Sequence, residues 1–184
     1  MMPFELGSIT AGPAGERPDL LAVPVAAFLA EHGLAERIGV FAIDPAISET
    51  AATREVYGLD PATLVNCVVV AGRREGAERV AACLVPSTKR ADVNGVVRKR
   101  LDVRKASFLA MDEAVGRTGM EYGGITPIGL PADWPILVDA DVVPQAVVLI
   151  GSGLRGSKLL VPGSVLAGLP GAEVVEGLGR PATP

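Results

Sequence analysis

The sequence predicts a single α+β domain built around a curved, mostly antiparallel sheet. Two β-branched runs, TLVNCVVVAG and ERVAACLVP, flank a polar turn at residues 73–78 and predict an antiparallel hairpin. Helical and strand-like segments are mixed without the strict βαβ alternation of a parallel sheet. The length of 184 residues, with 49% apolar and 21% charged residues, suits one folded core. We find no internal repeat and no linker that would divide the chain.

The elements before the hairpin follow from capping signals and short apolar runs. Residues 1–18 are rich in glycine, proline and small residues, and we expect a loose N-terminal lead there. A helix is predicted over residues 24–34, with Pro24 in its first turn. RIGVFAI then predicts a strand. SETAATREVYG predicts a short helix that Ser48 caps and Gly58 ends.

The elements after the hairpin include two helices and a loop rich in glycine and proline. Asp92 is expected to cap a helix whose valines share one face, and Asp112 a second helix that ends at Gly119. EYGGITPIGLPADW contains too many glycines and prolines for regular structure. PILVD, QAVVLIG and SKLLV predict strands, followed by a short helix near GSVLAGL and a last strand at AEVVE.

The net charge of −4 conceals a strongly basic segment. Residues 88–105 carry seven lysines and arginines against two aspartates, so this segment has a charge of +5 and the rest of the chain −9. A basic face on an acidic protein fits local contact with a polyanion. A merely solvated helix face gives the same pattern, so both interpretations stay open.

The scarcity of reactive side chains excludes several kinds of site. His32 is the only histidine, and with Cys67 and Cys83 it provides too few ligands for zinc and no independent Ser/His/Asp triad. Both cysteines lie in apolar runs, and we expect buried thiols, with a disulfide between neighbouring strands as the alternative. No apolar run approaches the roughly 20 residues that span a bilayer, and the N-terminus lacks a secretion signal. We therefore expect a cytoplasmic protein with no membrane association, metal or cofactor.

The segment VVLIGSGLRGSKLL spells the pattern G-x-G-x-x-G at Gly151, Gly153 and Gly156. In a dinucleotide-binding unit these glycines open a helix, and a second parallel strand follows. Here SKLLV is strand-like and a Pro-Gly pair follows it, which argues against such a helix. Two interpretations remain: a turn that joins two strands, or a turn that lines a substrate pocket.

Three segments in this order, GMEYGGITPIGLP, PILVD and GSGLRG, resemble the YbaK-type aminoacyl-tRNA deacylases, relatives of the editing domain of bacterial prolyl-tRNA synthetase. The resemblance covers roughly residues 25–176 and implies an editing domain over residues 19–178. It implies a mixed, curved sheet forming a partial barrel wrapped by helices. It also implies hydrolysis of the ester between a wrongly attached small amino acid and the terminal adenosine of a tRNA, without a metal or catalytic nucleophile.

The resemblance also implies partners. The expected substrate is the 3′ end of a mischarged aminoacyl-tRNA, and an aminoacyl-tRNA synthetase is a further expected partner. The chain itself is expected to be a monomer or a homodimer.

In this family a G-x-x-x-P loop holds the aminoacyl group with its backbone amides. The matching residues are Gly123, Gly124, Ile125, Thr126 and Pro127. Such amides can stabilise the negative charge that develops on an ester carbonyl, while a hydroxyl of the terminal ribose helps to activate water. Thr126 either orients substrate or is a plain turn residue. Tyr122 is expected to line the pocket, and Phe108 either packs in the core or lines the same pocket.

Residues outside the loop have two interpretations each. Asp139 either orients water or caps the turn that follows its strand. Ser152, beside Gly153, either donates its hydroxyl to substrate or bonds its own backbone. Arg155 either contacts a phosphate or pairs with a structural carboxylate.

Two positions depart from the family pattern. Asn66 stands where most members carry a lysine that contacts the terminal phosphate or ribose, so a charged hydrogen bond worth about 1.5–3 kcal/mol is missing. Lys158 stands where many members carry an acid. We predict that Lys158 supplies the lost cation from the opposite wall. The alternatives are a module that binds an aminoacyl ligand without efficient hydrolysis, and a scaffold that binds RNA through the basic helix alone.

Overall fold

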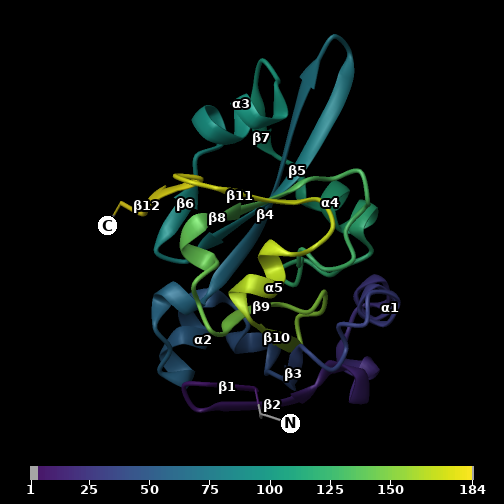
Figure 1. The fold of residues 1–184 in the computed structure, drawn as a ribbon, viewed down its shortest axis with the longest axis vertical. Coiled ribbons are helices and arrows are strands. Elements are labelled where there is room, and N and C mark those ends of the chain that lie inside the picture. The colour runs from purple at the N-terminus through teal and green to yellow at the C-terminus, as the bar shows by residue number, and fades with distance from the viewer. Residues whose placement is uncertain (1–3, 184) are drawn as a thin grey trace.

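The computed structural model describes residues 4–183, which form one α+β domain with two five-stranded sheets (Figure 1). The first sheet has the strand order β1-β2-β3-β10-β9, and the second has the order β11-β8-β5-β4-β7. All pairings are antiparallel except those of β8 with β5 and with β11. An isolated parallel bridge between Leu64 and Leu149 joins the two sheets. The predicted fold class is confirmed.

The described residues contain twelve strands and five α-helices. The strands are β1 (Phe4–Leu6), β2 (Ile9–Pro13), β3 (Gly39–Ala42), β4 (Val65–Arg74), β5 (Ala77–Pro86), β6 (Lys89–Ala91), β7 (Ala106–Phe108), β8 (Ile136–Asp139), β9 (Val148–Gly151), β10 (Ser157–Val161), β11 (Ala172–Val175) and β12 (Gly179–Pro181). The α-helices are α1 (Val23–Glu31), α2 (Thr50–Tyr57), α3 (Arg98–Leu101), α4 (Met111–Thr118) and α5 (Gly163–Ala167). A π-helical turn, η5 (Val93–Val97), precedes α3, and short 3-10 turns include η3 (Pro45–Ile47).

The predicted hairpin is confirmed as β4 and β5, which pair along their whole length. Its two-residue turn consists of Glu75 and Gly76, both with positive φ, a geometry that matches the twist of the flanking strands. The tip of this hairpin and α3 lie at one end of the molecule, and β1 and β2 lie at the other (Figure 1). The hairpin therefore connects the two ends of the domain.

The two ends of the chain are more ordered than the sequence predicts. Residues 4–13, expected in a loose lead, form the β1-β2 hairpin at the edge of the first sheet, with Gly7 in its turn at φ 58°. Alternate residues of β2 are buried, so Ile9 and Ala11 provide the apolar contacts that hold it. Residues 1–3 of the expected lead lie outside the described part. At the other end, β12 pairs with β6, so regular structure continues past residue 178.

The helix ends confirm some expected caps and correct others. Asp92 accepts hydrogen bonds from the backbone amides that open η5, as predicted for a cap. Ser48 is buried and does not cap α2, because Glu49 occupies the N-cap position. Asp112 lies inside the first turn of α4, where a carboxylate still favours the helix dipole, rather than at its cap. Gly58 and Gly119 end α2 and α4 in the left-handed conformation, as expected.

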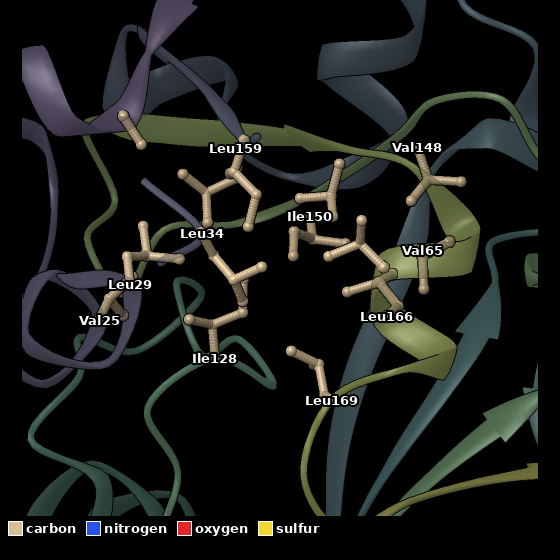
Figure 2. Close-up of a cluster of buried hydrophobic side chains, with 14 of the residues drawn as sticks. Val25, Leu29, Leu34, Val65, Ile128, Val148, Ile150, Leu159, Leu166 and Leu169 are labelled. Atoms are coloured by element: carbon tan, nitrogen blue, oxygen red, sulfur yellow. The ribbon is translucent and has the colours of Figure 1, made fainter. Parts of the chain in front are cut away.

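The largest hydrophobic cluster packs the first sheet against helices and against the G-x-x-x-P loop. Ile150 and Leu159 from the sheet belong to this cluster together with Val25 of α1 and Leu166 of α5 (Figure 2). Ile128, which follows the loop directly, is fully buried in the same cluster. The loop is thereby anchored to the core at its C-terminal end.

Both cysteines are free thiols, as expected. Burial raises the pKa of Cys83 to about 12 and also raises the pKa of Cys67. Each thiol therefore stays protonated near neutral pH, which makes it a poor nucleophile. Within residues 4–183, no helix combines the length and apolar character needed to cross a bilayer.

Candidate functional site

A cavity of about 640 Å³ lies between the two sheets, beside the Leu64–Leu149 bridge. Its walls come from β4, β9 and β10, from the start of α2, from the loop before Ile125, and from the segment that leads into α4. Its polar and charged lining groups are Ser48, Glu49, Thr50, Thr53, Asn66, Cys67, Tyr122, Arg155 and Lys158. The cavity is thus bounded by elements that lie far apart in the sequence.

Half of the predicted site residues line this cavity. Those that do are Asn66, Tyr122, Gly123, Ile125, Arg155 and Lys158. Those that do not are Gly124, Thr126, Pro127, Asp139, Ser152 and Gly153. The second group supports the walls from behind or lies elsewhere in the fold.

Backbone hydrogen bonds connect the G-x-x-x-P loop to the glycine turn after β9. The amide of Glu121 donates to the carbonyl of Gly153 (2.8 Å), and the amide of Gly153 donates to the carbonyl of Gly124 (2.7 Å). The amide of Gly124 is itself engaged by the carbonyl of Glu121 (2.9 Å), so it is not available to an acyl group. The amides of Gly123 and Ile125 meet no hydrogen-bond acceptor anywhere between residues 4 and 183. The amide of Thr126 has no such partner either, but Gly123 and Ile125 are the two residues with free amides that line the cavity.

The glycines at this contact are required by close approach. A Cβ on Gly124 would lie 2.9 Å from backbone atoms of Leu154, and a Cβ on Gly151 would lie 2.5 Å from the carbonyl oxygen of Gly124. Gly153 has φ 87°, and a Cβ there would overlap the side chain of Ala22. The G-x-G-x-x-G pattern therefore serves as a turn that supports the cavity wall.

Lys158 is a buried cation that faces the cavity. It lies on β10 directly opposite Gly151 of β9, a position that leaves room beside its side chain. Only 6% of Lys158 is exposed, and none of the ion pairs found in residues 4–183 includes it. Burial lowers the pKa of Lys158, and the positive charge of Arg155 lowers it further. A buried ammonium without a carboxylate partner is costly, and such a group commonly marks a site for an anionic ligand.

Arg155 provides a second cation at the cavity wall. Its guanidinium lies 5.9 Å from the centre of the Tyr122 ring and donates to the carbonyl of Pro45 (3.4 Å). The expected structural carboxylate is absent from residues 4–183, where no acidic side chain pairs with the guanidinium. Its backbone amide, in contrast, donates to the carboxylate of Glu121 (2.9 Å). The guanidinium is therefore free to meet an anion.

Asn66 is held by Thr50, which was not predicted as a site residue from the sequence. The hydroxyl of Thr50 donates to Oδ1 of Asn66 (2.9 Å), which leaves the amide group of Asn66 as a donor. Thr50 opens α2, and the N-cap residue Glu49 makes no side-chain capping bond. The N–H groups of the first helical turn have no partner within the helix, so this end of the cavity is rich in donors. The short polar run SET at residues 48–50 is the sequence feature that could have indicated Thr50 as a site residue.

One edge of β4 also faces the cavity with free backbone groups. The carbonyl of Val69 accepts from the amide of Leu109 (2.9 Å), while the amide of Ala82, its partner on β5, donates to Pro135 (3.0 Å). Val69 and Ala82 therefore form a non-hydrogen-bonded pair, with backbone groups directed away from each other. Cys67, two residues earlier, has the same orientation, so its N–H and C=O are directed away from β5, and Cys67 lines the cavity.

Asp139 and Ser152 have structural surroundings. The buried carboxylate of Asp139 accepts from Lys89 Nζ (2.9 Å) and from the backbone amides of Asp141 (3.0 Å) and Gly179 (2.7 Å), so it caps the turn that follows its strand. Its position does not support a role in orienting water. The fully buried hydroxyl of Ser152 contacts its own turn and the hydroxyl of Ser157 (2.7 Å), away from the cavity.

Thr126 is buried behind the cavity, whereas Phe108 and Tyr122 are exposed at its mouth. Thr126 is fully buried, and its Oγ1 is the one buried side-chain polar atom in residues 4–183 without a hydrogen-bond partner. Of the two positions expected for Phe108, the structure shows the pocket and not the core: Phe108 is 62% exposed at the cavity mouth because it lies on the short edge strand β7. Tyr122 is 49% exposed at the same mouth, as expected for a pocket residue.

Comparison with known proteins assigns the family. Residues 44–169 match the family model of the aminoacyl-tRNA editing domain. The chain belongs to this family. The matched range contains every residue that lines the cavity. The resemblance stated from the sequence is confirmed.

Solved structures show that the editing-domain fold is shared by proteins of low sequence identity. A protein proposed to be a trans-editing enzyme for prolyl-tRNA synthetase aligns with a TM-score of 0.74 at 21% identity, over 86% of this chain and 96% of that chain. The hypothetical protein APE2540 aligns with the same TM-score and identity, over 85% and 99%. A proposed signal transduction protein from Marinobacter aquaeolei aligns with a TM-score of 0.51 at 19% identity, over 84% of this chain but 30% of its own.

Proposed function

We propose that this editing domain is a free-standing aminoacyl-tRNA deacylase that hydrolyses the ester of mischarged tRNA carrying a small amino acid. The observation that carries the proposal is that one cavity contains both free cations and free backbone amides. The cations are Lys158 and Arg155, and the amides are those of Gly123 and Ile125. An aminoacylated tRNA end offers a matching pair of groups, because it has a phosphate and an ester carbonyl. Its partners are the tRNA 3′ end and the synthetase that mischarges it, in the cytoplasm.

The chemistry needs few side chains. The amides of Gly123 and Ile125 donate to the ester carbonyl oxygen and stabilise the negative charge that grows on it as water attacks the carbonyl carbon. The bond between that carbon and the ribose oxygen then breaks. The proton that water loses passes through the neighbouring ribose hydroxyl to the departing ribose oxygen, which leaves a free amino acid and an intact tRNA end. The proposed reaction is independent of metal and cofactor.

The apolar end of the cavity supports a short acyl side chain. Val69, Leu109 and Ile125 belong to one hydrophobic cluster and line this end, with buried Trp134 behind them. The small side chain of an alanyl, seryl or cysteinyl group would sit against Ile125 while its carbonyl meets the amide of the same residue.

A deacylation screen tests the proposed function. The full chain is incubated with tRNAs mischarged with alanine, serine or cysteine, and the released amino acid is measured with and without EDTA. We expect release from at least one of the three, at a rate that EDTA leaves unchanged. Absence of release from all three would overturn the proposal, and inhibition by EDTA would overturn its metal independence.

The second candidate function is a binding module that keeps the cavity and has lost efficient hydrolysis. Asn66 favours it, because this side chain supplies no charge and its Oδ1 is already occupied by Thr50. Tight binding of a non-cleavable aminoacyl-adenosine analogue, without turnover of the corresponding ester, would establish this function. A large gain of hydrolysis in Asn66→Lys would identify Asn66 as the cause.

A further inference from the structure

Exposed apolar side chains gather at the mouth of the cavity. Of the six large hydrophobic side chains that are exposed in residues 4–183, three line the cavity: Phe108 (62%), Met111 (51%) and Tyr122 (49%). Clustered exposed apolar groups commonly mark a contact surface. Flat aromatic faces at such a place suit the stacking of unpaired bases, since every base has a π-face.

Free positive charge follows this mouth along β7. Lys105 precedes β7 and lies three residues from Phe108, about 10 Å along an extended chain, so the two side chains project from opposite faces of this edge strand. Arg104 is next, and its amide donates to the carbonyl of Arg73 near the tip of the β4-β5 hairpin (3.5 Å). Arg73, Arg104 and Lys105 are all exposed, and none takes part in the ion pairs of residues 4–183.

Three neighbouring arginines are paired with acids, whereas Arg98 and Lys99 of α3 take part in none of the ion pairs of residues 4–183. Asp102 pairs with both Arg74 and Arg79, and Glu173 pairs with Arg100. On the other side of Phe108, the first turn of α4 carries the acids Asp112 and Glu113. Apart from Arg155 and Lys158 of the cavity itself, the free positive charge at the mouth therefore lies on the side that β7 forms.

We propose that this β7 surface, made of Arg73, Arg104, Lys105, Phe108 and Met111, binds the single-stranded RNA that precedes the aminoacylated nucleotide. A chain whose last nucleotide occupies the cavity must leave through the mouth, beside Phe108. The preceding base stacks on Phe108, and the phosphates continue along β7 to Lys105, Arg104 and Arg73. Pairing of a phosphate with such cations releases counterions and supplies affinity without reading sequence. The inference rests on the proposed function for the identity of the RNA end.

A charge-matched pair of double variants tests the surface. Arg104→Ala with Lys105→Ala removes two charges from the β7 surface, while Arg37→Ala with Arg90→Ala removes two exposed, unpaired charges that do not line the cavity. Binding of an uncharged, CCA-ended RNA hairpin is measured by fluorescence anisotropy between 50 and 200 mM salt. Two lost contacts to single-stranded phosphates should reduce the slope of log K against log salt by about 1.4 and weaken binding about tenfold at the lower salt concentration. The control pair should stay within about twofold of the parent.

Hydrolysis separates this inference from the proposed function. The β7 double variant should lose about tenfold in kcat/KM on the aminoacylated hairpin and keep the parent value on aminoacyl-adenosine, which lacks the preceding phosphates. Phe108→Tyr should bind the hairpin like the parent, whereas Phe108→Ala should bind it more weakly. Equal effects of the two charge-removing pairs, or parent-like RNA binding by the β7 variant, would overturn the inference. A parent that hydrolyses neither substrate would refute the proposed function, and the anisotropy comparison would still decide the surface.

Discussion

Replacement of Lys158 by methionine removes the buried charge and keeps an unbranched side chain of similar length. Lys158 is 6% exposed in the cavity wall and has no carboxylate partner in the described chain, so its ammonium is available to the substrate phosphate. A hydrogen bond to a charged group contributes about 1.5–3 kcal/mol. At 1.4 kcal/mol for each factor of ten, Lys158→Met should lower kcat/KM on mischarged tRNA about 10- to 150-fold.

The same substitution should stabilise the fold. Burial lowers the pKa of Lys158 below the ordinary lysine value of 10.5, so the unfolded chain binds more protons between the two values. The resulting penalty on the parent is fully present below the folded-state pKa and disappears as the pH rises towards 10.5. Lys158→Met should therefore unfold at higher urea concentration than the parent at pH 7, and this advantage should shrink as the pH rises.

Two measurements and a control variant refute or support this reasoning. Initial rates on mischarged tRNA give kcat/KM, urea titrations from pH 7 to 10 give the free energy of unfolding, and Arg54→Met serves as an exposed control. The reasoning is refuted if Lys158→Met hydrolyses mischarged tRNA within about threefold of the parent, well below the expected loss. Addition of Asn66→Lys to Lys158→Met should recover activity, because the lysine introduced at position 66 then supplies a positive charge from the opposite wall of the cavity.

The remaining predictions concern residues behind the cavity. Thr126→Val should raise the free energy of unfolding by about 1 kcal/mol, because it removes a buried hydroxyl without a partner; a simultaneous large loss of kcat would instead place that hydroxyl on the substrate. Asp139→Asn should lower the free energy of unfolding by about 1–3 kcal/mol through its lost bond to Lys89, with unchanged kcat in the folded enzyme; a selective fall in kcat would contradict its structural role. Gly124→Ala should destabilise the fold by about 1–3 kcal/mol in urea titrations, since its Cβ would press on the backbone of Leu154, and parent-like stability would contradict that contact.

Local sequence signals predicted the long elements and missed the short ones. The hairpin of β4 and β5 follows from two long β-branched runs, and Gly58 and Gly119 end their helices as glycine usually does. The strands β1, β6, β7 and β12 have three residues each, too few for an alternating pattern to stand out. They exist because each pairs with a neighbour brought to it by the rest of the fold. The same reason explains why residues 4–13 were expected to be loose.

The cavity could be predicted only in part, because its chemistry depends on partners distant in sequence. The glycines of residues 123–127 indicated free amides, but only the fold reveals that Glu121 engages the amide of Gly124 and leaves that of Gly123 free. The sequence left Arg155 with either a phosphate or a structural carboxylate as its partner, and the described structure places its guanidinium over Tyr122 without a carboxylate. The burial of Lys158 without an ion-pair partner likewise depends on the tertiary structure and could not be predicted from the sequence.

The contact between the two glycine loops changes how mutagenesis of this protein must be interpreted. At Gly124, Gly151 and Gly153, even a methyl group would collide with the facing loop. An alanine scan would therefore give inactive variants at positions whose own atoms never contact the substrate. These glycines would be misassigned as catalytic residues, although they are needed only for close packing. Chemical replacement of single peptide bonds by esters at Gly123 and Ile125 deletes the donors themselves while the contour of the wall is preserved.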